Sequence, residues 1–145
     1  MTSTNELIDH ETSLVRAFVL REKQERCLYL LSDVKRRKKF LDRLGHFRWL
    51  DPRFTSEAKW NPNPGHTLWS KHEQGIHNLF QLLKTKGAGA KCWAISQNSL
   101  IDGREVDAKE ALGNAVDSGL GTILSFVPGR LAYFKDEDES LLLVR

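Results

Sequence analysis

Apolar residues recur at helical spacing along the first half of this chain. The pattern predicts helices over 6–20, 22–31, 33–44 and 71–86, with Gly45 ending the third. Segment 13–20 also fits a strand, although helix is the preferred interpretation. The third helix is expected to bury a stripe of Val34, Leu41 and Leu44, widened by Phe40 and Phe47.

Short apolar runs of β type dominate the second half, from Lys91 onward. A strand is expected at 92–95, followed by a helix whose start, Asp107 with Glu110, has the form of a capping box and whose stop is Gly119. Three further strands are expected over 122–127, 130–135 and 140–144.

The order in this half is therefore strand, helix, strand, strand, strand. A helix that joins two consecutive strands favours a parallel pair with a right-handed crossover, because that hand packs the helix back on a twisted sheet. The sequence thus predicts an α+β fold, a single domain over 1–145 in which N-terminal helices pack on a C-terminal mixed β-sheet.

A chain of 145 residues with 40% hydrophobic content is long enough to bury one core. Cys27 and Cys92 lie in apolar runs and are expected in that core rather than in a catalytic site. No apolar run approaches the length of a membrane span, and no secretory pattern opens the chain. A cytoplasmic protein without membrane contact is expected.

The net charge of +3 conceals an uneven distribution. Residues 1–60 hold 13 Lys and Arg against 9 Asp and Glu, whereas residues 92–145 hold 5 against 9. Such a layout orients the first half toward an anionic partner, or two copies of the chain head to tail as a homo-oligomer. The alternative is that the charges only keep the protein soluble.

The densest positive run is KRRKK, at 35–39 in the third predicted helix. Helical spacing places four cations away from the apolar stripe, namely Lys35, Arg36, Lys39 and Arg43. They fit a surface that contacts phosphates or another polyanion. They also fit a solvated helix face relieved by an ion pair between Lys38 and Asp42.

Segment 56–70 shows no periodicity and contains Trp60 and Trp69 around two prolines, two asparagines and a glycine. A loop of this length inside a compact domain is uncommon and is more often functional than neutral. The two tryptophans are expected either to anchor the loop on the core or to contact a partner.

Three histidines, His66, His72 and His77, crowd beside Glu73, but their spacing does not place two ligands on one helix face. Neither a metal site nor a cofactor is expected.

A competing ligand site follows from the predicted parallel strands, whose carboxyl ends share one edge. It would gather Ser96, Asn98, Asp102, Arg104, Glu105 and Arg130.

Segments 40–54 (FLDRLGHFRWLDPRF) and 121–134 (GTILSFVPGRLAYF) resemble stretches of small uncharacterised bacterial proteins. The resemblance implies a bacterial origin and carries no activity or catalytic residue.

The preferred hypothesis is a non-catalytic binding or regulatory protein. Its basic helix and tryptophan loop would contact nucleic acid or an acidic protein, through Lys35, Arg36, Lys39, Arg43, Trp60 and Trp69. An inhibitor of the immunity or antitoxin type is one form of the protein-binding version. The alternative is a small enzyme or ligand sensor that uses the polar loop 96–105.

Overall fold

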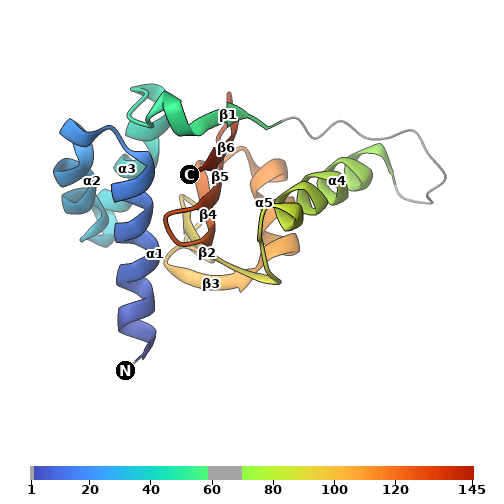
Figure 1. Ribbon diagram of the computed structural model, residues 1–145, viewed down its shortest axis with the longest axis horizontal. Helices are drawn as coiled ribbons and strands as arrows, with labels where there is room; N and C mark the ends of the chain where they lie inside the picture. The colour runs from blue at the N-terminus through green and yellow to red at the C-terminus, as the bar shows by residue number, and fades with distance from the viewer. Residues whose placement is uncertain (1, 59–69) are drawn as a thin grey trace.

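A β-sheet lies between two layers of helices in the computed structural model (Figure 1), which describes residues 2–58 and 70–145. The side chains described are those of residues 10–58, 70 and 72–145. The helices and 3-10 segments are α1 (Thr2–Phe18), η1 (Arg21–Lys23), α2 (Gln24–Leu31), α3 (Val34–His46), η2 (Pro52–Phe54), α4 (Lys71–Thr85) and α5 (Ala108–Ser118). The strands are β1 (Thr55–Glu57), β2 (Lys91–Ser96), β3 (Arg104–Asp107), β4 (Thr122–Val127), β5 (Leu131–Lys135) and β6 (Ser140–Val144).

The α+β class predicted from the sequence is confirmed, but the predicted parallel pair is wrong. The sheet order is β1-β6-β5-β4-β2-β3, and every neighbouring pair among these strands is antiparallel. The reason is β3, which the sequence pattern did not reveal. Because β3 turns back along β2 before α5 begins, β4 enters the sheet antiparallel to β2 rather than parallel to it.

The two faces of the sheet are covered by different helices. Residues of α1, α2 and α3 pack on one face against Trp93, Ile95, Ile123 and Phe134. Residues of α4 and α5 pack on the other face against Ala94, Leu124 and Tyr133. Successive strand residues alternate between these two cores, as the pleat of a strand requires. The positive run of α3 is therefore held in the layer formed by α1–α3.

Three helix ends are defined by residues that lie close together in the chain. The Asp107 carboxylate accepts a hydrogen bond from the Glu110 amide at 3.0 Å, as the capping box predicts. Gly119 ends α5 with a φ of 70°, a left-handed conformation that suits glycine. Ser70 caps α4 through the amide of Glu73.

Two expectations for the third helix are wrong. Val34 is 79% exposed, so the buried stripe begins further along, and Phe40, Leu41 and Leu44 fill it. Gly45 does not end the helix, which continues to His46. Gly45 is instead a point of close approach, because a Cβ there would lie 2.3 Å from Oδ2 of Asp136.

The first helix is confirmed as helix, and segment 13–18 is not a strand. Cys27 and Cys92 are buried, as expected of core residues. No helix in the described part of the chain combines the length and apolarity needed to cross a bilayer.

Candidate functional site

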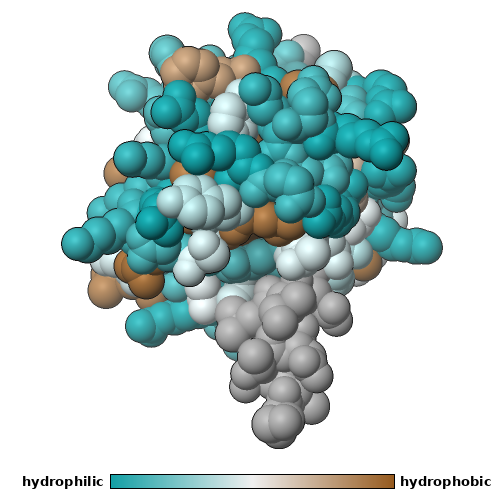
Figure 2. Space-filling view, turned by 90° about the vertical axis from the view of Figure 1, so that its left-hand side faces the viewer, coloured by the Kyte–Doolittle hydropathy of each residue, from teal (hydrophilic) through white to brown (hydrophobic). Residues whose placement is uncertain are grey.

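The four cations expected on the outer side of the third helix all lie on α3. Lys35 and Lys39 are exposed, and Arg36 and Arg43 are half-buried. Across the described residues, neither of the two lysines forms an ion pair. Figure 2 views the molecule from the side on which α2 and α3 lie, and that surface is mostly hydrophilic with small, separate hydrophobic patches.

Two half-exposed aromatic rings lie among these cations. The guanidinium of Arg36 is 4.5 Å from the centre of the Tyr29 ring, and that of Arg26 is 5.3 Å from the same ring. The guanidinium of Arg43 is 4.5 Å from the centre of the Phe47 ring. Tyr29 is 47% exposed and Phe47 49%. A guanidinium held over a ring gains about 0.5–1 kcal/mol at an exposed site and keeps its full charge.

We call this surface the α2–α3 basic face; its residues are Arg26, Tyr29, Lys35, Arg36, Lys39, Arg43 and Phe47. Acidic residues of α2 and α3 themselves offset it only weakly. Asp33 lies 3.6 Å from Arg36, both side chains are about two-fifths exposed, and such surface pairs contribute little. The ion pair of Lys38 with Asp42 is not formed among the described residues. Residues 16–48 carry eleven Lys and Arg against four Asp and Glu.

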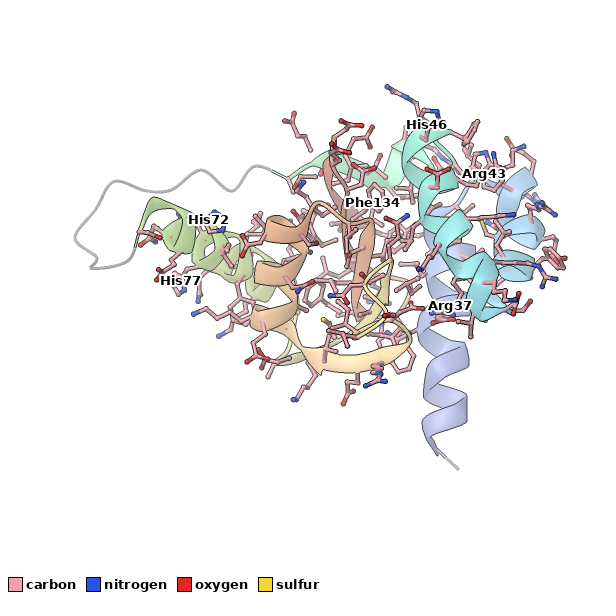
Figure 3. The ribbon with its side chains drawn as sticks, turned by 180° about the vertical axis from the view of Figure 1, so that it is seen from behind. Arg37, Arg43, His46, His72, His77 and Phe134 are labelled. Atoms are coloured by element: carbon pink, nitrogen blue, oxygen red, sulfur yellow. The ribbon has the colours of Figure 1, made fainter. Side chains whose placement is uncertain are left out.

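Arg37 does not join this face, because its side chain turns inward (Figure 3) and is only 11% exposed. It donates to both carboxylate oxygens of Glu11 on α1, at 2.6 and 2.8 Å. It also donates to both oxygens of Asp102, in the loop before β3, at 2.9 and 3.1 Å. One guanidinium thus joins α3 to α1 and to the 96–103 loop.

The two carboxylates are themselves held in place. Trp93 donates from Nε1 to Glu11 at 3.0 Å, and the Ser96 amide donates to Asp102 at 3.0 Å. Burial alone would lower the pKa of Arg37, but its hydrogen bonds and charge contacts with the two acids outweigh burial and raise that pKa. Arg37 is therefore a permanent cation that fixes the position of α3, and with it the basic face.

The competing ligand site does not assemble as predicted. The Asp102 carboxylate already accepts hydrogen bonds from Arg37. Ser96 is buried, and its hydroxyl forms a hydrogen bond with the Thr122 hydroxyl at 2.7 Å and accepts one from the Asn98 amide at 2.9 Å. Such contacts are those of a structured turn. Arg104 and Glu105 are exposed and lie on the edge strand β3.

Arg130 is at the other end of the sheet from this loop. Ser96 pairs with Thr122, where β4 begins, whereas Arg130 follows Val127, where β4 ends. The prediction that they share an edge is wrong because it assumed parallel strands. Arg130, the second arginine of the predicted anion site, therefore does not reach the 96–105 loop.

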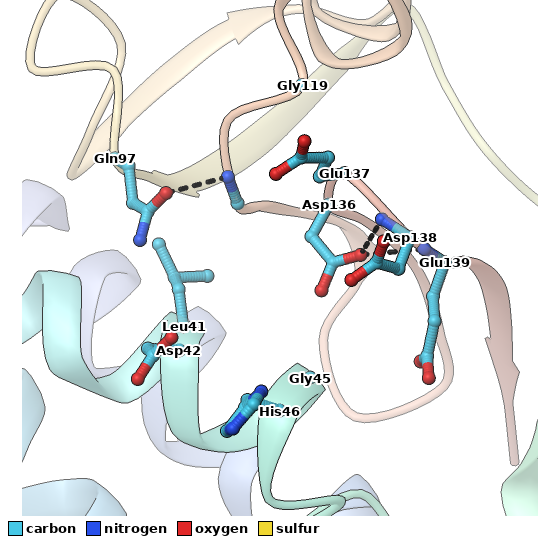
Figure 4. A pocket seen from close by; sticks show the side chains of 11 residues that line it. Leu41, Asp42, Gly45, His46, Gln97, Gly119, Asp136, Glu137, Asp138 and Glu139 are labelled. Carbon is cyan, nitrogen blue, oxygen red and sulfur yellow. Dashed lines mark hydrogen bonds between the residues drawn. The ribbon is translucent and has the colours of Figure 1, made fainter.

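A cavity of about 290 Å³ lies between the second half of α3 and the turn that joins β5 to β6 (Figure 4). Its acidic lining residues are Asp42, Asp136, Glu137, Asp138 and Glu139. Oδ1 of Asp136 accepts from the amides of Asp138 and Glu139 at 2.9 and 2.7 Å, which shapes the turn. The molecule thus carries an acidic hollow against the second half of α3, whereas the charge distribution along the sequence predicted separate basic and acidic parts.

The described residues contain no group of three or more His, Cys, Asp and Glu side chains arranged to hold a metal ion. His72 contacts Asp117 of α5, and His66 lies outside the described residues, as do Trp60 and Trp69.

The two cysteines are held in their protonated form by burial. Burial raises the pKa of Cys27 to about 12, against a smaller lowering by Lys23. Burial is also the main cause that raises the pKa of Cys92 to about 12. Neither thiol is a nucleophile near neutral pH.

Sequence reasoning found the cations of the face and missed its aromatic residues. Phe47 was assigned to the core stripe, and Tyr29 was not singled out. No local signal identifies Tyr29, because its contact with Arg36 depends on how α2 packs on α3. The sequence offers only one hint, namely that Tyr29 is an aromatic residue on the polar side of α2, which precedes the basic helix α3.

Comparison of the chain with protein-family models, with curated proteins and with solved structures finds no match. The resemblance of segments 40–54 and 121–134 to small bacterial proteins stays a prediction. Function is accordingly inferred from the chemistry of the α2–α3 basic face.

Proposed function

We propose that this protein is a non-catalytic binding protein that holds a polyanionic partner on the α2–α3 basic face. The observation that carries the proposal is the environment of Arg36 and Arg43. Both guanidinium groups lie over half-exposed aromatic rings rather than against buried carboxylates. A guanidinium stacked in this way keeps the N–H donors at its edge for an anionic group of a partner.

The spacing of these residues fits an extended partner. Arg36 and Arg43 are seven residues apart, which is about two helical turns and about 10.5 Å along one side of α3. Lys39 lies between them on the same side. A row of cations of this length matches a partner with regularly repeated negative charges better than it matches a single small anion.

Rigidity of the face also supports the proposal. The bidentate contacts of Arg37 with Glu11 and Asp102 fix α3 from its inner side. Cations on a fixed helix lose less freedom when a partner binds than cations on a mobile segment. Nucleic acid and an acidic protein both carry such repeated charge, and an inhibitor of the immunity or antitoxin type would use the same face.

Charge reversal tests the proposal. The variant K35E/R36E/K39E/R43E removes four cations of the face, and K84E/K86E/K91E/K109E applies the same charge change around α4 and α5. Binding of a labelled oligonucleotide and of a labelled polyglutamate would be measured by fluorescence anisotropy. The first variant is expected to lose binding and the second to retain it; equal loss in both would show that net charge, not this face, controls binding.

A further inference from the structure

The two half-exposed rings of the α2–α3 basic face stand at opposite ends of its row of cations. Tyr29 contacts Arg36, in the first turn of α3, and Phe47 is the residue that caps the end of α3. Each ring also contacts Arg36 or Arg43 within 4.5 Å. The row of cations on α3 is therefore flanked by one ring at each end.

We propose that the polyanion is a single-stranded nucleic acid, with Tyr29 and Phe47 as stacking positions for its bases. This inference rests on the proposed function. Proteins that bind single strands combine a track of cations for the phosphates with aromatic side chains on which bases stack. In a duplex the faces of the bases are covered by their neighbours, so exposed rings add affinity only for an unpaired strand.

The arginines can contact both the bases and the phosphates of such a strand. A guanidinium plane that covers a ring is itself a stacking surface for a base, and its edge donates to phosphate oxygens. Two guanidinium groups, those of Arg26 and Arg36, lie on the Tyr29 ring. An acidic protein would use the charge of these residues but would gain nothing specific from planar, exposed surfaces.

Three probes separate stacking from charge. They are a labelled oligothymidylate of about 12 nucleotides, a strand of the same length that lacks bases, and a hairpin duplex. The wild-type protein is expected to bind oligothymidylate about a hundredfold more tightly than the base-free strand, because each of two stacked bases adds about tenfold to affinity. The duplex is expected to resemble the base-free strand.

Three variants locate the effect. Y29L and F47L are each expected to weaken binding of oligothymidylate by about tenfold while leaving the base-free strand unchanged. Y29F keeps the ring and is expected to bind like the wild type. Both positions are half-exposed, and a melting curve for each variant checks that the fold is retained.

Contrary results are distinct. Equal affinity for oligothymidylate and the base-free strand, with both lost in K35E/R36E/K39E/R43E, would overturn the stacking inference and leave the proposed function standing. The same follows if Y29L weakens both strands equally, because the ring then only positions the arginines. Binding of polyglutamate without any oligonucleotide also overturns the inference. Binding of none of these polyanions would remove the proposed function as well.

Discussion

Arg37 donates from Nε to Oδ2 of Asp102 at 2.9 Å, across 65 residues of sequence. The same guanidinium holds Glu11, so the one arginine of the KRRKK run that turns inward ties three segments together. Its neighbours on the helix remain outside with their charge available. The basic run thus divides into a structural residue and an exposed basic surface.

Replacing Arg37 by Met is expected to destabilise the protein by about 3 kcal/mol. The substitution leaves the carboxylates of Glu11 and Asp102 largely buried without their cation, which costs more than the pair itself contributes. Urea unfolding measures the change. Lys38→Met, at an exposed neighbouring position, is the control and should alter stability by less than about 0.5 kcal/mol. Similar losses in the two variants would contradict the role of Arg37.

Asp102 and Arg104 belonged to the same predicted ligand site and are expected to behave differently. Asp102→Ala removes the partner of Arg37 and of the Ser96 amide, and should cost about 2–3 kcal/mol in urea unfolding. Arg104→Ala, on the exposed edge of β3, should cost less than about 0.5 kcal/mol. If the aspartate variant unfolds like the wild type, the loop is not structural and a ligand site there regains support.

Gly45→Ala is expected to destabilise the protein by about 1–2 kcal/mol, although alanine favours a helix. The added Cβ would lie 2.3 Å from Oδ2 of Asp136 and 3.1 Å from Cζ of Phe134, so the Asp136 carboxylate, which accepts from the amides of Asp138 and Glu139, would have to move. Gly113→Ala is the matched control in α5, where the nearest atom would be 3.9 Å away. It should stabilise the protein by about 1 kcal/mol. Opposite signs in thermal melts are the predicted result.

The two cysteines give a dependence of stability on pH. A thiol whose pKa is raised in the folded state holds its proton more tightly when folded, so its contribution is complete below the ordinary value of 9.0 and is lost as pH rises toward about 12. Stability is therefore expected to fall above pH 9.0. C27A/C92A should show a shallower fall than the wild type. Identical slopes would mean that the thiols titrate normally.

Sequence reasoning was most successful where structure depends on neighbours in the chain. Asp107 with Glu110 predicted a helix start and Gly119 its end, because caps form between residues a few positions apart. Gly45 was predicted to end the third helix, but its role is close approach to Asp136, which lies far along the chain. Strand β3 went unrecognised because charged residues fill this edge strand, so it shows no apolar run.

The candidate site was likewise predicted where it depends on spacing within one helix, and missed where it depends on contacts between segments. Helical periodicity separated Lys35, Arg36, Lys39 and Arg43 from the core, and the structure places them on the outer side of α3. Periodicity could not show that Arg37 would find two carboxylates from distant segments. It also gave no reason to connect Tyr29 with Arg36, because that contact is made between two helices.

The measurement that tests the central claim most directly is the affinity of the wild-type protein for a single-stranded oligonucleotide as salt rises from about 50 mM to about 200 mM. Engagement of the four α3 cations predicts saturable binding whose logarithm falls with the logarithm of salt at a slope of about −3. Polyglutamate in the same titration detects an acidic protein partner. Absence of saturable binding to either polyanion at the lowest salt, or affinity that does not change with salt, would contradict the account.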